Sequence, residues 1–89
     1  MPAISMFYGI IIYLYYFDTG KHKMPHNHAK FQEFEAVLSI PEGMVLDGLI
    51  PEKNLTLVKA WITIHQEELV ANWSLAVNGE QVFSIDPLI

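Results

Sequence analysis

The fold is decided by the stretch Phe7-Tyr8-Gly9-Ile10-Ile11-Ile12-Tyr13-Leu14-Tyr15-Tyr16-Phe17. It consists almost entirely of β-branched and aromatic residues, which is the composition of a β-strand. Alternate residues of a strand face opposite sides, so one side carries Tyr8, Ile10, Ile12, Leu14 and Tyr16. The other side is also apolar and is rich in tyrosine. We therefore expect one central strand over 7–17, ended by a turn at 18–20.

Three shorter strands are predicted after this stretch. Alternating polar and apolar residues favour strands at 28–32, 35–40 and 44–48, with a tight reversal at 32–34 and a turn at 41–43. Ala29 and Phe31 should face the core, which places His28 and Lys30 on the other side. The spacing is that of hairpins and predicts an antiparallel meander.

A long helix is predicted in the second half of the chain. Pro51 suits a first turn, the run 52–77 contains no glycine or proline, and Asn78 and Gly79 form a stop signal. One broad helical face collects the apolar residues and two polar ones: Leu55, Val58, Trp61, Ile62, His65, Leu69, Asn72, Trp73 and Ala76. We expect a single α+β domain over 1–89: a three- to four-stranded antiparallel meander, one long helix packed on it, and a short strand-like tail at 81–85.

The composition indicates a partner. Of the 89 residues 52% are hydrophobic and the mean hydropathy is +0.26, which is more apolar surface than a small monomer easily hides. Candidate interface residues are Tyr13 and Tyr15 on the tyrosine-rich strand side, and Leu57, Ile64 and Leu75 on one flank of the helix. We expect this chain to bind another small protein or a second copy of itself.

The chain carries no signal of export. It has no cysteine for a disulfide, its longest apolar run is too short to span a bilayer, and no basic segment precedes that run. We therefore expect a cytoplasmic protein without a membrane segment.

Charge is unevenly distributed along the sequence. The net charge is −5, with +2 up to Phe31 and −7 from Gln32 onward, and there is no arginine. This balance disfavours a nucleic-acid-coating protein, although tyrosines beside His28 and Lys30 could stack a base. Lys21, Lys23 and Lys30 form a candidate anion-binding patch, with ordinary solvated lysines as the alternative.

The segment 21–30 is the best candidate for chemistry. His26 and His28 form an H-x-H pattern that on a strand presents two imidazoles to one side, as a transition-metal site requires. His22 and Glu35 are the candidate further ligands of a divalent transition metal, with Glu33 as another carboxylate. The alternative is a pair of exposed or hydrogen-bonded loop histidines. No catalytic residue can be assigned, because no nucleophile lies in an acid–base setting.

Two polar residues are predicted to be buried. His65 and Asn72 lie on the apolar face of the helix, where each needs a hydrogen-bond partner. Burial of His65 away from any carboxylate would favour its neutral form.

The sequence resembles a family of small bacterial proteins called domain of unknown function 4160. The similarity lies in the opening Met1 to Ile12, in Pro25-His26-Asn27-His28, in Ala60 to Leu69, in Asn72-Trp73, and in the closing Asn78-Gly79-Glu80 and Ile85 to Leu88. Members often have Pro-Pro-His-Phe-His-Val around the histidines, so Asn27 stands where an aromatic residue is common.

This resemblance implies a function as well as a fold. Members of the family look like partners of another small family, domain of unknown function 2442, in gene pairs similar to toxin–antitoxin modules. The leading hypothesis is therefore a protein-interaction module, and the alternative is a small metal-dependent, nuclease-like toxin that uses His26 and His28.

Overall fold

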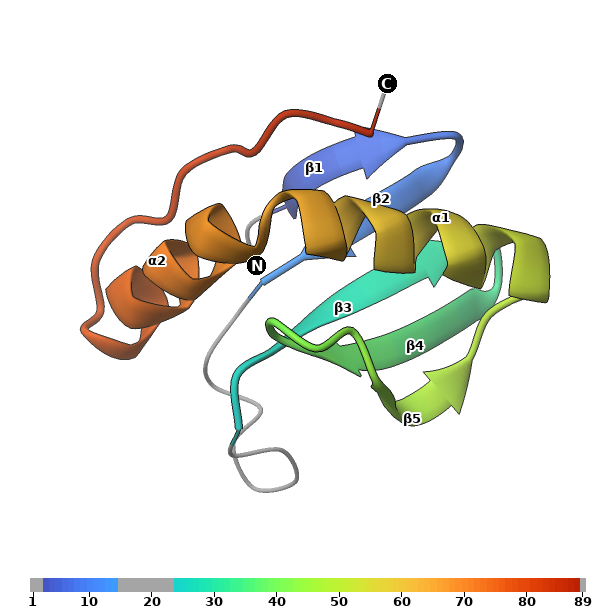
Figure 1. The fold of residues 1–89 in the computed structure, drawn as a ribbon, viewed down its shortest axis with the longest axis horizontal. Coiled ribbons are helices and arrows are strands. Elements are labelled where there is room, and N and C mark those ends of the chain that lie inside the picture. Colours follow the sequence, from blue (N-terminus) through green and yellow to red (C-terminus); the bar gives the residue numbers. More distant parts are fainter. Residues whose placement is uncertain (1–2, 15–23, 89) are drawn as a thin grey trace.

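The computed structural model of the chain describes residues 3–14 and 24–88 (Figure 1). Five strands come first and two helices follow, in the order β1 (Ala3–Phe7), β2 (Ile10–Tyr13), β3 (His26–Phe31), β4 (Phe34–Ser39), β5 (Val45–Leu49), α1 (Glu52–Ile64) and α2 (Gln66–Val77). Each strand pairs antiparallel with the next along the chain, so the sheet is a meander. The predicted α+β class is confirmed, but the sheet has five strands and the helix is divided in two.

The first apolar stretch is a hairpin, and the prediction of a single strand over 7–17 is wrong. Tyr8 and Gly9 join β1 to β2, and their φ angles of 50° and 77° are both positive. A two-residue hairpin turn of this kind requires positive φ at both positions, which glycine adopts without steric cost. Ile10, Ile12 and Leu14 are fully buried as the alternation predicts, and residues 15–17 lie outside the described part of the chain.

The register sorts the side chains of the sheet between two faces. Ile12, Ala29 and Ala36 lie side by side on neighbouring strands and belong to the same hydrophobic core as Val58 and Trp61 of α1. Helix α1 therefore covers this inner face, which Figure 1 shows. The opposite face, called the outer face, carries an in-register row of one residue from each strand: Met6, Ile11, Lys30, Glu35 and Leu49.

The predicted helix over 52–77 bends at His65, whose φ and ψ of −111° and 30° are not helical. Backbone hydrogen bonds continue across the bend, from His65 N–H to Trp61 O (3.0 Å) and from Leu69 N–H to His65 O (2.9 Å). The His65 ring turns toward Glu68 in the first turn of α2, so side-chain contacts accompany the bend without any glycine or proline. The predicted inward face is nevertheless correct on both sides of the bend, with Val58, Trp61, Ile62, Leu69 and Asn72 buried.

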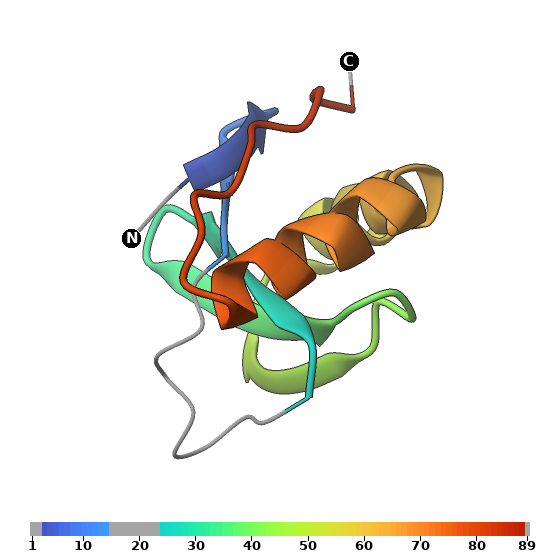
Figure 2. The same ribbon diagram turned by 90° about the vertical axis from the view of Figure 1, so that its left-hand side faces the viewer.

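The C-terminal tail covers the core without becoming a strand. Residues 80–88 form no helix or strand and run between the helices and β1 (Figure 2). Ile85 is buried in the core, and its N–H donates to the carbonyl oxygen of Ile4 (2.8 Å). This backbone hydrogen bond holds the tail beside β1.

Within residues 3–14 and 24–88, neither helix has the length and the apolar character needed to cross a membrane.

Candidate functional site

The histidine motif lies where β3 begins, close to α2. His26 is fully buried, its Nδ1 lies 2.8 Å from the carbonyl oxygen of Met24, and its ring is centred 5.1 Å from the ring of Trp73 in α2. The ring of His28 is 5.4 Å from that of His26, edge to face. The structure thus brings the two imidazoles together, with His26 packed as part of the protein interior.

His28 faces away from α1, and its ring is almost fully buried. Its Nδ1 lies 3.1 Å from Oε2 of Glu35 on β4. The contact follows from the register, since Glu35 pairs with Lys30, two residues from His28 on the same side of β3. A carboxylate placed in this way orients the imidazole.

A metal centre at this motif remains a prediction. The structure places His28 beside His26 and beside Glu35, while His22 lies outside the described residues. Across residues 3–14 and 24–88, no three histidine, aspartate or glutamate side chains gather so that they could hold a metal ion. The Nδ1 contacts of His26 with a backbone carbonyl and of His28 with a carboxylate are those that usually orient an imidazole for binding a metal through Nε2.

Asn27 is a feature that the sequence analysis did not anticipate. Its side chain is fully buried on the inner face, in register with Leu38. Neither Oδ1 nor Nδ2 has a hydrogen-bond partner among the described residues. A buried amide without partners lowers stability. Asn27 lies on the same strand face as the apolar residues Ala29 and Phe31, and this position was the signal that could have predicted its burial.

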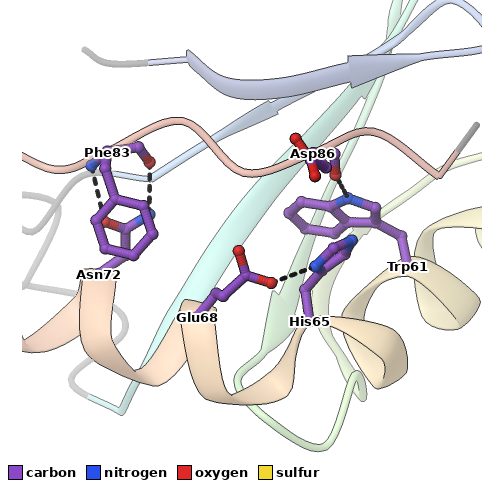
Figure 3. Close-up of polar contacts among 6 residues, drawn as sticks. All are labelled: Trp61, His65, Glu68, Asn72, Phe83 and Asp86. Atoms are coloured by element: carbon purple, nitrogen blue, oxygen red, sulfur yellow. Dashed lines mark hydrogen bonds and ion pairs between the residues drawn. The ribbon is translucent and has the colours of Figure 1, made fainter.

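Polar side chains of the helices hold the tail by its backbone (Figure 3). Asn72 is fully buried; its Nδ2 donates to the carbonyl oxygen of Phe83 (2.8 Å), and its Oδ1 accepts the N–H of the same residue (2.9 Å). The Nε1 of Trp61 donates to the carbonyl oxygen of Asp86 (2.8 Å). These bonds satisfy backbone groups of a tail that forms no strand ladder.

His65 lies at the bend between the helices, beside Trp61. Its side chain is 13% exposed, and Nδ1 contacts Oε1 of Glu68 at 2.5 Å (Figure 3). The sequence predicted a buried His65 with no carboxylate near its ring. Burial is confirmed, but the absence of a carboxylate is wrong, because the bend directs the imidazole toward Glu68 in the first turn of α2.

The outer face carries the remaining strand candidates. Tyr13 is half-buried and lies in register with His28, and Lys30 is exposed, whereas Tyr15, Lys21 and Lys23 lie outside the described residues. At the two ends of the in-register row, Met6 and Leu49 are 65% and 69% exposed. Sequence analysis missed both, because neither the hairpin nor the register of the edge strands was predicted.

An open groove of about 370 Å³ lies on the outer face over β1 and β2. Its walls include Met6, Ile11 and Tyr13 of the sheet and Ser84, Ile85 and Pro87 of the tail. The tail therefore builds one side of a largely apolar hollow at the end of the sheet opposite β5.

The helix flank predicted as an interface is only partly exposed. Leu57 and Leu75 are half-buried, and Leu57 packs against the core. Ile64 is 64% exposed. The flank thus offers one large free side chain rather than a continuous apolar strip of three.

Comparison with known proteins identifies a family. Residues 9–74 match the family model described as Domain of unknown function (DUF4160). No curated protein and no solved structure matches the chain. The match spans β2 to most of α2, and so includes the histidine strand, the bend at His65 and Asn72. The chain is therefore a member of the family of domains of unknown function DUF4160.

Proposed function

We propose that this protein is a protein-interaction module that binds another small protein through the outer face of its sheet. The observation that carries the proposal is the pair of large apolar side chains, Met6 and Leu49, exposed at the two ends of that face. An antiparallel sheet covered on one side usually presents polar residues to water on the other. Large apolar side chains and an apolar groove on this face fit a surface that another chain covers.

The family resemblance supports a particular kind of partner. Proteins similar to this one look like members of gene pairs with a domain of unknown function 2442 protein, arranged like toxin–antitoxin modules. A small protein encoded beside this one is therefore the first partner to test. Association with such a protein would cover apolar surface that a chain of this size cannot hide within its own core.

Co-expression with the product of the adjacent short reading frame tests the proposal. We expect the two proteins to elute together at micromolar concentration, and Leu49→Glu to separate them by placing a charge in the contact. Ile64→Glu is the matched control, since Ile64 is about equally exposed but lies on α1. Separate elution of the two unmodified proteins would contradict the proposal.

The contact between His28 and Glu35 favours a second candidate, a small metal-dependent, nuclease-like toxin. In this role His28 and Glu35 would bind the metal or position water, and Lys30 on the same face would attract phosphate. Metal analysis of protein purified without an affinity tag is the first test. Substoichiometric metal that does not change in His28→Ala would remove this candidate.

A further inference from the structure

We infer that the outer face docks on the outer face of a second copy of this chain, with Leu49 of each copy seated in the groove over β1 and β2 of the other. The inference rests on the proposed function, because it names an occupant for the same surface. Its basis is the order of side chains in the part of the row from Ile11 to Leu49, which is complementary to itself when reversed.

Reversal of the row follows from symmetry. Two sheets packed face to face by a twofold axis parallel to their strands present their strands in opposite order. With the axis between β3 and β4, Lys30 of one copy lies opposite Glu35 of the other, and Ile11 lies opposite Leu49. With the axis on β3, Lys30 would instead face its own symmetry mate, and like charges would oppose each other.

The apolar ends of the row differ in shape in the way that such docking needs. Leu49 on the edge strand β5 is 69% exposed and protrudes from the outer face. At the other end, Met6 and Ile11 border the groove of about 370 Å³. The reversed row brings a protruding side chain of each copy over the hollow of the other, so the same contact forms twice.

The charges at the centre of the row are available for pairing between copies. Lys30 is exposed and forms no ion pair or hydrogen bond with any residue of the described ranges. Glu35 contacts His28 through Oε2 only, and its side chain is 47% exposed. Each interface would therefore gain two Lys30–Glu35 contacts without breaking the contact to His28.

The size of the face limits the strength of the dimer. In the proposed pairing four strands of each copy face each other, and three interstrand spacings of about 4.8 Å place Leu49 roughly 14 Å from Ile11 along the row. A contact of that width lies at the low end of specific interfaces. We expect a dimer that dissociates on dilution through the micromolar range.

Sedimentation equilibrium of the full chain, over a concentration series from about ten to several hundred micromolar, tests the inference. The unmodified protein should shift from monomer to dimer across the series. Leu49→Glu should weaken the dimer at least tenfold, because each copy would place a carboxylate in the apolar groove of the other. Ile64→Glu should leave the dissociation constant unchanged.

A charge reversal tests the placement of the axis. Lys30→Glu should weaken the dimer, since it sets two carboxylates against each other at both contacts. The double variant Lys30→Glu/Glu35→Lys should recover most of the lost affinity, with circular dichroism verifying that it is folded. A folded double variant without recovery would overturn the pairing of Lys30 with Glu35.

Three further outcomes would overturn the inference. These are a monomer at every concentration, a dimer indifferent to Leu49→Glu, or a dimer dissociated by Ile64→Glu. If the unmodified protein is a monomer and yet co-elutes with its neighbour in a manner that Leu49→Glu abolishes, the proposed function stands and the second copy is excluded. Loss of both associations would refute both proposals.

Discussion

Two asparagines provide a matched test of the core, because Asn27 and Asn72 are equally buried but differ in their hydrogen bonds. Both side chains have no exposed surface. Asn72 binds the N–H and the carbonyl oxygen of Phe83, whereas neither polar atom of Asn27 has a partner among the described residues. Leucine has the same number of side-chain heavy atoms as asparagine and the same branching. Substitution by leucine should therefore change stability in opposite directions at the two positions.

The magnitudes follow from the hydrogen bonds. A buried polar group without a partner costs about 1–3 kcal/mol, so Asn27→Leu should raise the free energy of unfolding by about 2 kcal/mol. Asn72→Leu removes two hydrogen bonds and leaves the backbone groups of Phe83 without them. It should lower the free energy of unfolding by about 2–4 kcal/mol.

Thermal unfolding followed by circular dichroism measures both effects. In a domain of this size each kcal/mol shifts Tm by roughly 4–8 °C, so Asn27→Leu should melt about 10 °C above the unmodified protein and Asn72→Leu at least as far below it. Urea titration should give the same order with similar slopes. A loss of stability in Asn27→Leu, of the size seen for Asn72→Leu, would show that the amide of Asn27 is paired and that the reasoning is wrong.

Three further substitutions test the tail, the edge strand and the bend. Ile85→Ala should lower the free energy of unfolding by about 2–4 kcal/mol in a urea titration, because it leaves a cavity under the tail. Phe83→Ala is the control: Phe83 is 40% exposed, so its loss should lower the free energy of unfolding by well under half of that amount. Gly48→Ala should lower Tm more than Gly79→Ala. Both glycines have positive φ, but only at Gly48 would the new Cβ meet backbone, at 2.2 Å from the carbonyl oxygen of Glu35. His65→Asp should lower stability by about 2 kcal/mol in urea, since it sets a second carboxylate beside Glu68 in a mostly buried place; an unchanged midpoint would contradict the contact.

The periodicity of the sequence predicted which faces of the strands and helices are buried better than it predicted where these elements end. The buried set Ile10, Ile12 and Leu14 and the inward face of the helices follow from alternation and from helical spacing, and the structure agrees with both. The turn at Tyr8 and Gly9 was missed because apolar residues continue on both sides of it. Nothing in the local pattern distinguishes a long strand from two strands joined by a two-residue turn, except a glycine that tolerates positive φ.

The bend at His65 is accompanied by side-chain contacts that the linear pattern did not predict. The run 52–77 has neither glycine nor proline, so local signals favour an unbroken helix. The ring of His65 instead lies between Trp61 and Glu68, and the tail passes over Trp61. Trp61 and Asp86 are 25 positions apart, so sequence spacing does not reveal the contact between them.

The candidate binding surface depends on register, and this is why it could not be derived from the sequence. The alternation of polar and apolar residues correctly places Lys30 and Ala29 on opposite faces of the sheet. It does not predict which residue of the next strand lies beside Lys30. A shift of one position between β3 and β4 would move Glu35 to the inner face and remove the charge alternation from the row. A different length for β1 would likewise move Met6 away from Ile11. The self-complementary order of Ile11, Lys30, Glu35 and Leu49 exists only in the observed register, so variants at Leu49 and Lys30 test the register together with the proposed docking.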